Sequence, residues 1–413
     1  MKKLLIISFD LIRPGESNVS LAIASLLAYL KNDVGYNKDF VVNHLSLNMF
    51  KISNKGKVEH FYNLLSEIDF TKVDFIALSA YIWNEYLTNN LIKYIKKTFN
   101  YKGKIILGGY QISYSSNPKL EYPDAHFFIS GYAEKALLDI VTYKNSKILS
   151  QSKLDFSLLP SPYLKDEIPI LKNQKMVRLE TKRGCPYRCT FCAHRDLTSN
   201  KVHKHNIDKV FKEIAFFKEK NVGKINIVDP IFNMGKNYLN VMQEMSSVNL
   251  KSLVSVQARF EMIKGEKGEQ FLDLCQKLNF HLEFGLQTSI ISESQIINRK
   301  NNPSEITKVM QKLNERGISY EISLIYGLPN QTLDSFQKSI DYVIKNGCSN
   351  ITAFPMMLLK GTELYDQKKI FAFEERSIGE FNIPVVIKSN SFSEEDWFTM
   401  KNISEKLGEN NRI

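Results

Sequence analysis

Three cysteines lie close together near the middle of the chain, at Cys185, Cys189 and Cys192. They form the pattern Cys-x-x-x-Cys-x-x-Cys, and Gly184 and Pro186 keep this stretch out of regular secondary structure. Such a loop can present three thiolates toward one side. Thiolates are the ligands that iron–sulfur clusters select, and three of them can hold three irons of a cubane while the fourth iron keeps an open position. We therefore predict that these cysteines bind a [4Fe-4S] cluster.

Two other interpretations of the cysteines are a structural zinc site and chance clustering. Zinc needs four ligands, and His194 could be the fourth, but structural zinc sites normally use paired Cys-x-x-Cys units and only one is present. The other cysteines, Cys275 and Cys348, lie far apart, which does not favour a disulfide framework. Cys275 shares the apolar face of a helical pattern, so we expect a buried structural thiol.

The first 150 residues alternate apolar runs with helical patterns. A helix is predicted over 20–30 and another carries Leu87, Leu91, Ile92 and Ile95 at helical spacing. This alternation predicts a Rossmann-like parallel sheet with helices on both faces, with ligands at the carboxyl ends of the strands. The expected strands are 3–9, 40–47, 73–80, 104–107 and 126–130.

Residues 151–172 break this rhythm and are predicted to be a proline-punctuated linker. Residues 173–375 then show six strand–helix units, which predict an open, partial (β/α)6 barrel with its chemistry at the carboxyl ends of the strands. Cys185 follows the first of these strands, and the last region, 376–413, is an extension with a helix over 394–407. His203 and His205 flank the first barrel helix and are expected at the surface. The expected strands are 177–180, 224–228, 253–257, 281–286, 320–326 and 351–359.

Composition limits the classes of protein. The 413 residues are 43% hydrophobic, enough for packed cores, which excludes a disordered chain. The net charge of +11 is spread along the chain without a dense block, so nucleic-acid binding is not favoured. The apolar run after Met1 stops at Asp10, and no stretch is long and apolar enough to span a membrane. We expect a cytoplasmic protein with no membrane contact.

The cysteine pattern, with an aromatic residue just before its last cysteine, resembles the motif of the radical S-adenosylmethionine (SAM) superfamily. Three further segments resemble that family's fourth strand, its fifth strand and the region after its sixth: 281–288 (HLEFGLQT), 325–332 (IYGLPNQT) and 359–364 (LKGTEL). The resemblance implies that SAM binds the open iron and is cleaved reductively to a 5′-deoxyadenosyl radical. A reductant such as flavodoxin or ferredoxin and a small-molecule or peptide substrate are implied as partners.

The same resemblance implies a set of SAM contacts. Phe191 would pack beside the adenine, with Gly327 and Pro329 letting the backbone approach it closely. Gln287 and Arg259 are candidates for the ribose and carboxylate, although both could be ordinary polar ends of strands. The family's glycine-glycine-glutamate motif is missing from the second strand, and Asp229 is the candidate there for the amino group of SAM. The residues are Phe191, Gln287, Gly327, Pro329, Arg259 and Asp229.

The first domain resembles the cobalamin-binding domain that precedes many radical SAM barrels. Small residues that follow or end its strands are expected to lie near the cofactor, and two aromatic residues are candidates to pack on the corrin or, alternatively, to lie at the edge of the core. Cobalamin mutases have a cobalt-ligating histidine in the loop after the first strand, where this chain has Ile12, so no protein imidazole is expected below the cobalt. The candidates are Ser79, Trp83, Gly108, Gly109, Tyr110 and Gly131.

Three functions follow from these patterns. The leading hypothesis is a cobalamin-dependent radical SAM methyltransferase acting on an unactivated carbon. The second is a radical SAM enzyme of cyclisation, rearrangement or epimerisation whose first domain is a scaffold, which would form no S-adenosylhomocysteine. The third is an RNA-binding or RNA-modifying protein, motivated by the basic charge; the absence of cysteine before residue 185 does not favour its tRNA-thiomethylating form.

Overall fold

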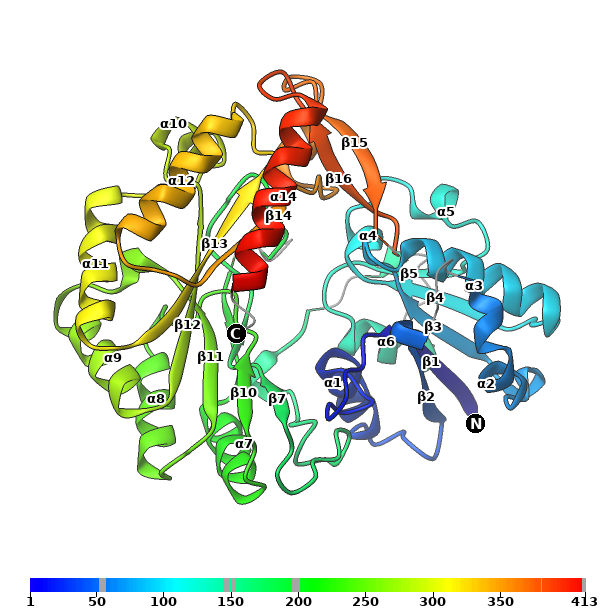
Figure 1. Ribbon diagram of the computed structural model, residues 1–413. Helices are drawn as coiled ribbons and strands as arrows, with labels where there is room; N and C mark the ends of the chain where they lie inside the picture. Colours follow the sequence, from blue (N-terminus) through cyan, green and yellow to red (C-terminus); the bar gives the residue numbers. More distant parts are fainter. Residues whose placement is uncertain (52–56, 144–148, 151–152, 195–200, 380, 411–413) are drawn as a thin grey trace. The chain divides into compact units, whose positions relative to one another are not determined.

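The computed structural model describes residues 1–51, 57–143, 149–150, 153–194, 201–379 and 381–410 (Figure 1). The chain divides into two compact units. The N-terminal unit comprises Met1–Leu171 with Ile378–Ile383, and the barrel unit comprises Lys172–Ser377 with Pro384–Ile413. The described residues of the predicted linker, up to Leu171, therefore lie in the N-terminal unit.

The N-terminal unit is built on a six-stranded sheet in the order β2-β1-β3-β4-β5-β6, in which every pairing is parallel. The five predicted strands are confirmed, and a short sixth strand was not expected. The strands are β1 (Lys2–Asp10), β2 (Phe40–Asn48), β3 (Phe75–Ser79), β4 (Lys104–Gly108), β5 (Phe127–Ile129) and β6 (Leu149–Ser150). The helices are α1 (Leu21–Lys31), α2 (Tyr62–Ser66), α3 (Glu85–Thr98), α4 (Tyr110–Ser113), α5 (Pro118–Glu121) and α6 (Glu134–Val141).

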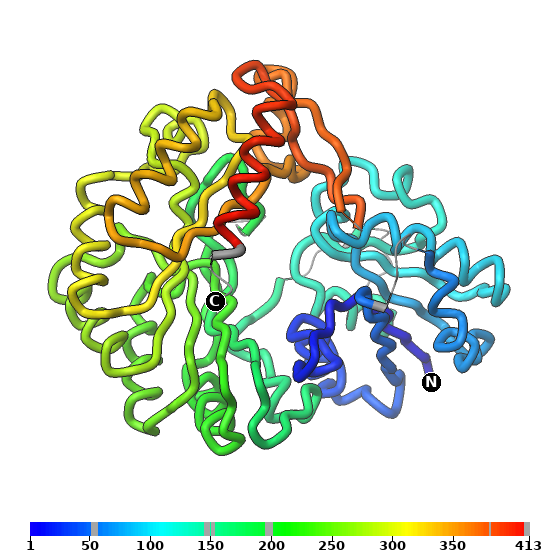
Figure 2. The backbone as a smooth tube through the Cα atoms, viewed as in Figure 1, coloured from blue at the N-terminus to red at the C-terminus, as the bar shows by residue number. Residues whose placement is uncertain are grey.

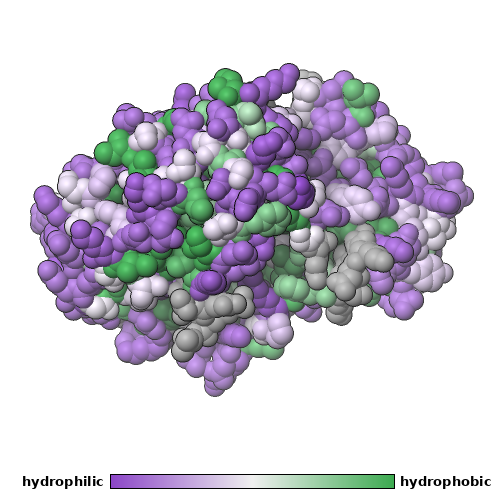
Figure 3. All heavy atoms as spheres, turned by 45° about the horizontal axis from the view of Figure 1, so that its top comes forward, coloured by the Kyte–Doolittle hydropathy of each residue, from purple (hydrophilic) through white to green (hydrophobic). Residues whose placement is uncertain are grey.

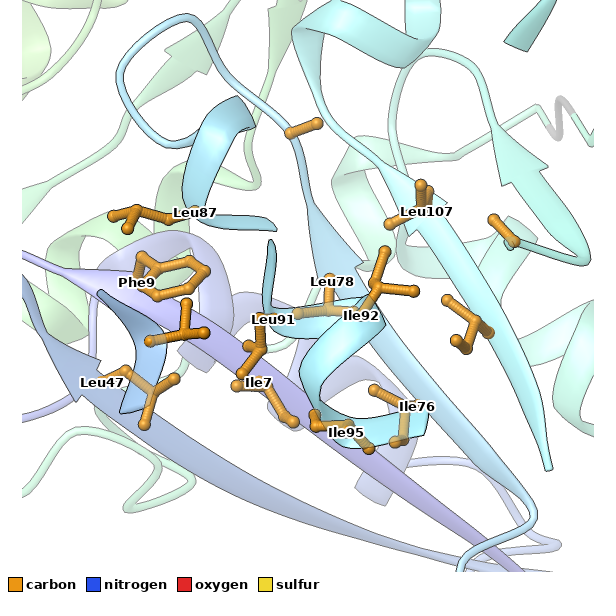
Figure 4. Close-up of a cluster of buried hydrophobic side chains, with 14 of the residues drawn as sticks. Ile7, Phe9, Leu47, Ile76, Leu78, Leu87, Leu91, Ile92, Ile95 and Leu107 are labelled. Carbon is orange, nitrogen blue, oxygen red and sulfur yellow. The ribbon is translucent and has the colours of Figure 1, made fainter. Parts of the chain in front are cut away.

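Strand β1 is buried on both faces, which explains its continuous apolar sequence. Its odd-numbered side chains pack in one core with α3, whose predicted apolar face is confirmed by the burial of Leu87, Leu91, Ile92 and Ile95 (Figure 4). Its even-numbered side chains Leu4 and Ile6 pack in the second core with residues of α1 and α6. The sheet thus has helices on both faces, as the alternating pattern predicts.

The barrel unit contains a second parallel sheet, in the order β14-β13-β12-β11-β10-β7. Figure 2 follows its backbone from green to orange along the sequence, and the six predicted strands are confirmed. The strands are β7 (Met176–Leu179), β10 (Lys224–Ile227), β11 (Leu253–Ala258), β12 (Phe280–Gln287), β13 (Ser319–Tyr326) and β14 (Ile351–Pro355). The helices are α7 (Ile207–Glu219), α8 (Tyr238–Ser247), α9 (Gly265–Lys277), α10 (Ile291–Ile296), α11 (Pro303–Glu315), α12 (Leu333–Lys345), α13 (Glu363–Asp366) and α14 (Glu394–Asn410).

The ends of the barrel differ in detail from the sequence prediction. Strand β14 ends at Pro355, not at residue 359. Beyond it, the carbonyl of Met356 accepts a hydrogen bond from the amide of Val386. Val386 belongs to a two-stranded sheet formed by β15 (Glu374–Ile378) and β16 (Ile383–Lys388). A second short antiparallel pair, β8 (Lys182–Arg183) and β9 (His203–Lys204), follows β7. The predicted C-terminal helix is α14, which packs on β14 and buries Trp397.

One face of the molecule can be compared with the composition of the chain. On the face drawn in Figure 3, hydrophilic side chains predominate and hydrophobic ones are interspersed among them. Within the described part of the chain, no helix is both long and apolar enough to cross a membrane.

Candidate functional site

The three clustered cysteines occupy a loop that begins after β8. Gly184 starts it with φ of +86°, a left-handed conformation that glycine adopts readily. Cys185 and Cys189 are each 8% exposed, and Cys192 is half-buried. The Cys192 amide donates to the Cys189 carbonyl at 3.1 Å, so the last two cysteines share one turn. Phe191, the predicted adenine neighbour, is half-buried on the same turn.

Burial sets the chemistry of the thiols. It raises the pKa of Cys185, which the neighbouring Arg259 and Arg299 counteract, and it raises the pKa of Cys192 to about 11. Within the described ranges, no three His, Cys, Asp or Glu side chains converge closely enough to hold a single metal ion. A cubane places each thiolate on a different iron, so it does not require the three sulfurs to converge on one point.

Arg259 follows directly after β11 and is 5% exposed. Its guanidinium lies over the ring of Tyr187, inside the cysteine loop, with 3.6 Å between the guanidinium carbon and the ring centroid. Its Nε lies 2.5 Å from Oε1 of Glu261. The predicted SAM contact Arg259 is therefore beside the cluster loop, stacked on one of its residues.

Arg299 is a site residue that the sequence reasoning missed. It follows α10, interacts with the thiol of Cys189, and has a buried Nε without a hydrogen-bond partner among the described residues. Burial lowers the pKa of this guanidinium, and the nearby Arg259 lowers it further. A half-buried cation beside the cysteines fits an anionic group. No spacing pattern in the sequence singles out this arginine.

Gln287 ends β12 with φ of +70°, which is uncommon for a residue other than glycine. The pairing of β12 with β13 shifts register between Gly285 and Gln287. A Cβ on Gly285 would lie 2.5 Å from Nε2 of Gln287 and 3.8 Å from a terminal nitrogen of Arg299. The amide of Gln287 and the guanidinium of Arg299 therefore both lie near the space above Gly285, and a side chain there would displace the Gln287 amide.

The turn after β13 carries Gly327 and Pro329, both buried. Gln331, fully buried, accepts hydrogen bonds on Oε1 from the amides of Gly327 (2.7 Å) and Leu328 (3.2 Å). Gly327 has φ of +89°, and a Cβ there would lie 3.4 Å from Cβ of Met356. Backbone conformation alone thus accounts for this glycine, and its contact with adenine stays a prediction.

Asp229 follows β10 and is fully buried. Its carboxylate accepts hydrogen bonds from the amides of Thr181 (2.8 Å) and Lys182 (3.2 Å) and from the Thr181 hydroxyl. Burial raises the pKa of Asp229 to about 6, although Lys182 opposes the shift. These contacts hold the segment that leads into the cysteine loop, and they explain Asp229 without a SAM amino group; that contact stays a prediction.

The expected surface position of His205 is wrong. The residue is 6% exposed, and its Nε2 lies 2.9 Å from Oε2 of Glu180, which also accepts from Nε of Arg183 at 2.8 Å. Burial raises the pKa of Glu180, but Arg183 and His205 outweigh that effect and the net pKa is lowered. Strand β9 pairs with β8, and this pairing brings His205, the residue after β9, to the end of β7. The sequence pattern does not predict the pairing.

The carboxyl ends of the N-terminal strands hold the predicted cobalamin residues. Ser79 ends β3, Gly108 ends β4 and is buried, and Gly131 follows β5 in open space, since a Cβ added there would have no atom within 4 Å. Gly109 has φ of +94°, and a Cβ there would lie 2.7 Å from the carbonyl oxygen of Ala80. Close packing of the β3 and β4 ends therefore requires Gly109 in any case.

Two aromatic pairs lie at the same edge. Trp83, 42% exposed, stacks on Tyr81 with 4.7 Å between ring centroids and 3° between planes. Tyr110 packs on Tyr114 with 4.5 Å between ring centroids.

The loop after β1 contains Ile12, the residue at the position of the cobalt-ligating histidine of cobalamin mutases. The amide of Ile12 donates to Oδ1 of Asn48 at 3.3 Å. No histidine is present in the described segments that directly follow β1, β3, β4 and β5.

Comparisons with known proteins identify a family model and relatives that this chain resembles. Residues 179–343 match the model of the radical SAM superfamily. The cobalamin-dependent radical SAM methyltransferase TokK of Streptomyces tokunonensis is 24% identical over 233 residues, which are 53% of this chain and 34% of TokK. The chain thus spans about a third of the length of this curated relative.

Two solved structures share the fold over nearly the whole chain. The radical SAM methyltransferase TsrM of Kitasatospora setae, with tryptophan and a SAM analogue bound, has a TM-score of 0.72 at 12% identity, covering 98% of this chain and 89% of TsrM. The cobalamin-dependent SAM radical enzyme OxsB, with aqua-cobalamin and SAM bound, has a TM-score of 0.64 at 15% identity, covering 99% of this chain and 62% of OxsB.

Proposed function

We propose that this chain, whose residues 179–343 match the radical SAM superfamily, is a radical SAM enzyme and, more specifically, a cobalamin-dependent methyltransferase acting on an unactivated carbon of a small molecule. The observation that carries the proposal is the meeting of three elements in the barrel unit: the cysteine loop, the Arg259 stack on Tyr187, and Arg299 with its unsatisfied donor. The donor set suits an iron–sulfur cluster with an anionic ligand beside it.

Each barrel residue has a definite task in this proposal. Cys185, Cys189 and Cys192 hold the cluster. Arg299 would donate to the carboxylate of SAM through its terminal nitrogens, because its guanidinium lies beside Cys189. Gln287, whose amide lies beside the same guanidinium, donates to an adjacent oxygen of SAM. The cationic pair Arg259 and Arg299 favours the thiolate form of Cys185, which burial alone would disfavour.

The adenine contacts come from two further turns. Gly327, whose amide is held by Gln331, and the nearby Pro329 would contact the adenine through their backbone, and Phe191 would pack beside it. When bound, the cluster supplies the electron for cleaving SAM and cobalamin supplies the methyl group. A low-potential flavodoxin or ferredoxin is the proposed source of electrons.

The N-terminal unit fits cobalamin in three respects. Its strand order places the topological switch between β1 and β3, where ligands of such sheets bind. The Tyr81–Trp83 stack gives this edge an exposed, flat apolar surface. Gly131 leaves open space around its backbone. The likeness of OxsB, which was solved with aqua-cobalamin, supports the same assignment.

The lower face of the cobalt would lack a protein imidazole, because Ile12 stands where cobalamin mutases have a histidine and the neighbouring described segments contain none. An unligated lower face favours methyl transfer over adenosyl homolysis. A domain that has lost cobalamin would show the same residues, so the scaffold hypothesis is the alternative that the experiment must separate.

The test is anaerobic reconstitution of the full chain with iron, sulfide and hydroxocobalamin, followed by an iron count, an absorbance spectrum and product analysis. Four irons, one bound cobalamin and formation of S-adenosylhomocysteine are the expected results. Iron without cobalamin, and 5′-deoxyadenosine without S-adenosylhomocysteine, would replace the methyltransferase with the scaffold hypothesis. Zinc in place of iron would refute the radical mechanism.

A matched pair of variants controls the reconstitution. Cys189→Ala should lose the cluster. Cys275→Ala should keep the cluster, because Cys275 is a buried thiol on α9 and is not part of the cysteine loop. Retention of iron by both variants would mean that the iron is bound nonspecifically, and loss from both would mean that the loss is not specific to the cluster loop.

A further inference from the structure

One short segment, residues 296–301, begins at the last residue of α10, leads toward α11, and contacts both halves of the proposed SAM site. On one side it binds the cysteine loop. The amide of Thr190 donates to the carbonyl of Ile297 at 3.0 Å, and Nδ2 of Asn298 donates to the carbonyl of Arg188 at 2.8 Å. Arg188 and Thr190 flank Cys189, so both sides of this cysteine are fixed by the segment.

On its other side the segment binds the end of β12. Nδ2 of Asn301 donates to the carbonyls of Leu286 (2.9 Å) and Thr288 (3.1 Å). These are the carbonyls immediately before and after Gln287, the residue with φ of +70°. The sheet register shifts at this point, which disrupts the regular ladder of hydrogen bonds there. Asn301 therefore spans a strained residue and stabilises it from both sides.

Arg299 lies between these two sets of contacts. Its backbone amide donates to the carbonyl of Ser294 at 2.8 Å, which fixes the backbone. Its guanidinium lies near the thiol of Cys189. The guanidinium also lies near the space above Gly285, which the side-chain amide of Gln287 occupies. The same six residues thus hold the cluster loop, carry the cation, and constrain the strand end.

We infer that Asn301 is a positioning residue for SAM, acting through Gln287, and that residues 296–301 form a strut that fixes the distance between the cluster loop and the SAM-binding strand end. This inference rests on the proposed SAM site. Its bonds are not those of an ordinary helix cap, since the neighbouring Asn302 is the residue that caps α11. Strained conformations that the surroundings enforce are frequent at ligand sites.

The test uses the reconstituted full chain and Asn301→Asp, which keeps the shape of the side chain but removes both donated hydrogen bonds. The dissociation constant of SAM is measured by equilibrium dialysis, and the reduced cluster is observed by electron paramagnetic resonance with and without SAM. We expect SAM to bind about tenfold to hundredfold more weakly, which is the effect of losing one hydrogen bond to a charged group. The spectrum without SAM should match that of the wild type.

The matched control is Asn314→Asp. Nδ2 of Asn314 also donates to a backbone carbonyl, that of Asn346 at 3.0 Å, but in a different part of the unit. This variant should bind SAM like the wild type. Asn301→Ser keeps one donor and should give an intermediate affinity; it carries the test if Asn301→Asp does not fold.

A double variant separates positioning from a general structural role. If Asn301 acts through Gln287, then Asn301→Asp should have little further effect on SAM binding in a Gln287→Ala background. Equal SAM binding by Asn301→Asp and wild type, or fully additive effects in the double variant, would overturn the inference alone. A wild-type chain that holds a cluster but binds no SAM would instead overturn the proposed function, and this inference with it.

Discussion

Replacement of Arg299 by methionine tests the proposed carboxylate contact, because it should affect ligand binding and folding in different ways. Methionine has a similar length and no charge, so it can fill the space without a polar atom. Truncating one partner of a buried, hydrogen-bonded charge pair costs about 2–5 kcal/mol of binding. The dissociation constant of SAM should therefore rise about thirtyfold or more.

The stability of the metal-free chain should not fall. Nε of Arg299 is buried without a hydrogen-bond partner among the described residues, and such a group costs about 1–3 kcal/mol. Burial also lowers the pKa of the guanidinium, which is the sign of a charge held in an unfavourable environment. Removing it should leave the free energy of unfolding unchanged or raise it by up to about 1–3 kcal/mol.

The assay pairs equilibrium dialysis of SAM on the reconstituted chain with urea denaturation of the metal-free chain. Arg316→Met is the control: Arg316 pairs with Glu269 at 2.6 Å and with Asp273, so its loss removes ion pairs and should not alter SAM binding. Unchanged SAM affinity in Arg299→Met would refute the carboxylate contact. A clear loss of stability would refute the argument that the cation is held for a ligand at the expense of folding.

Three further predictions concern other residues. Trp83→Ala should weaken cobalamin binding by about fivefold to thirtyfold, measured by absorbance titration, with little effect on stability because the ring is 42% exposed; unchanged binding would place the corrin elsewhere. Gly109→Ala should destabilise the chain more than Gly131→Ala in urea denaturation, since both have positive φ but only Gly109 faces a backbone oxygen at 2.7 Å; equal effects would contradict this packing. Asp229 has a folded pKa of about 6, above its ordinary 3.8, so its contribution to stability is fully present below about pH 4 and is lost as the pH rises through 6. The stability of the metal-free wild type relative to Asp229→Asn should therefore fall by about 3 kcal/mol between pH 4 and pH 7, and a pH-independent difference would show that the carboxyl titrates normally.

Hydrophobic patterning predicts most of the fold. The apolar runs of β1 and β12 and the face of α3 are local signals, because each strand or helix must bury its own side chains wherever it packs. The end of β14 differs from the prediction because residues 356–359 stay apolar. The amide of Met356 still donates to Tyr326 of β13, but its carbonyl accepts from Val386 of β16, and this contact is not visible in the sequence. Burial alone does not distinguish a strand from a buried turn.

The candidate site is predictable only where its residues share one segment. The cysteines are recognisable because all three thiolates come from one loop. Arg299 and Asn301 belong to the site because residues 296–301 fold back onto the cysteine loop and onto β12, contacts that tie together positions far apart in the sequence. His205 is buried for a similar reason, its pairing with Glu180. Such contacts depend on tertiary packing, and a single sequence carries no periodic signal for them.

Helix α14 has a consequence for the solubility of the barrel unit. Strand β14 is the last in its sheet, and an uncovered edge strand is a template for pairing with another chain. The helix lies against this strand, and the hydroxyl of Ser404 donates to the carbonyl of Ala353 at 2.7 Å. By occupying this edge the helix protects against intermolecular β-sheet growth. Weakening its attachment, for example at the fully packed Trp397, should therefore lead to aggregation before it affects any chemistry.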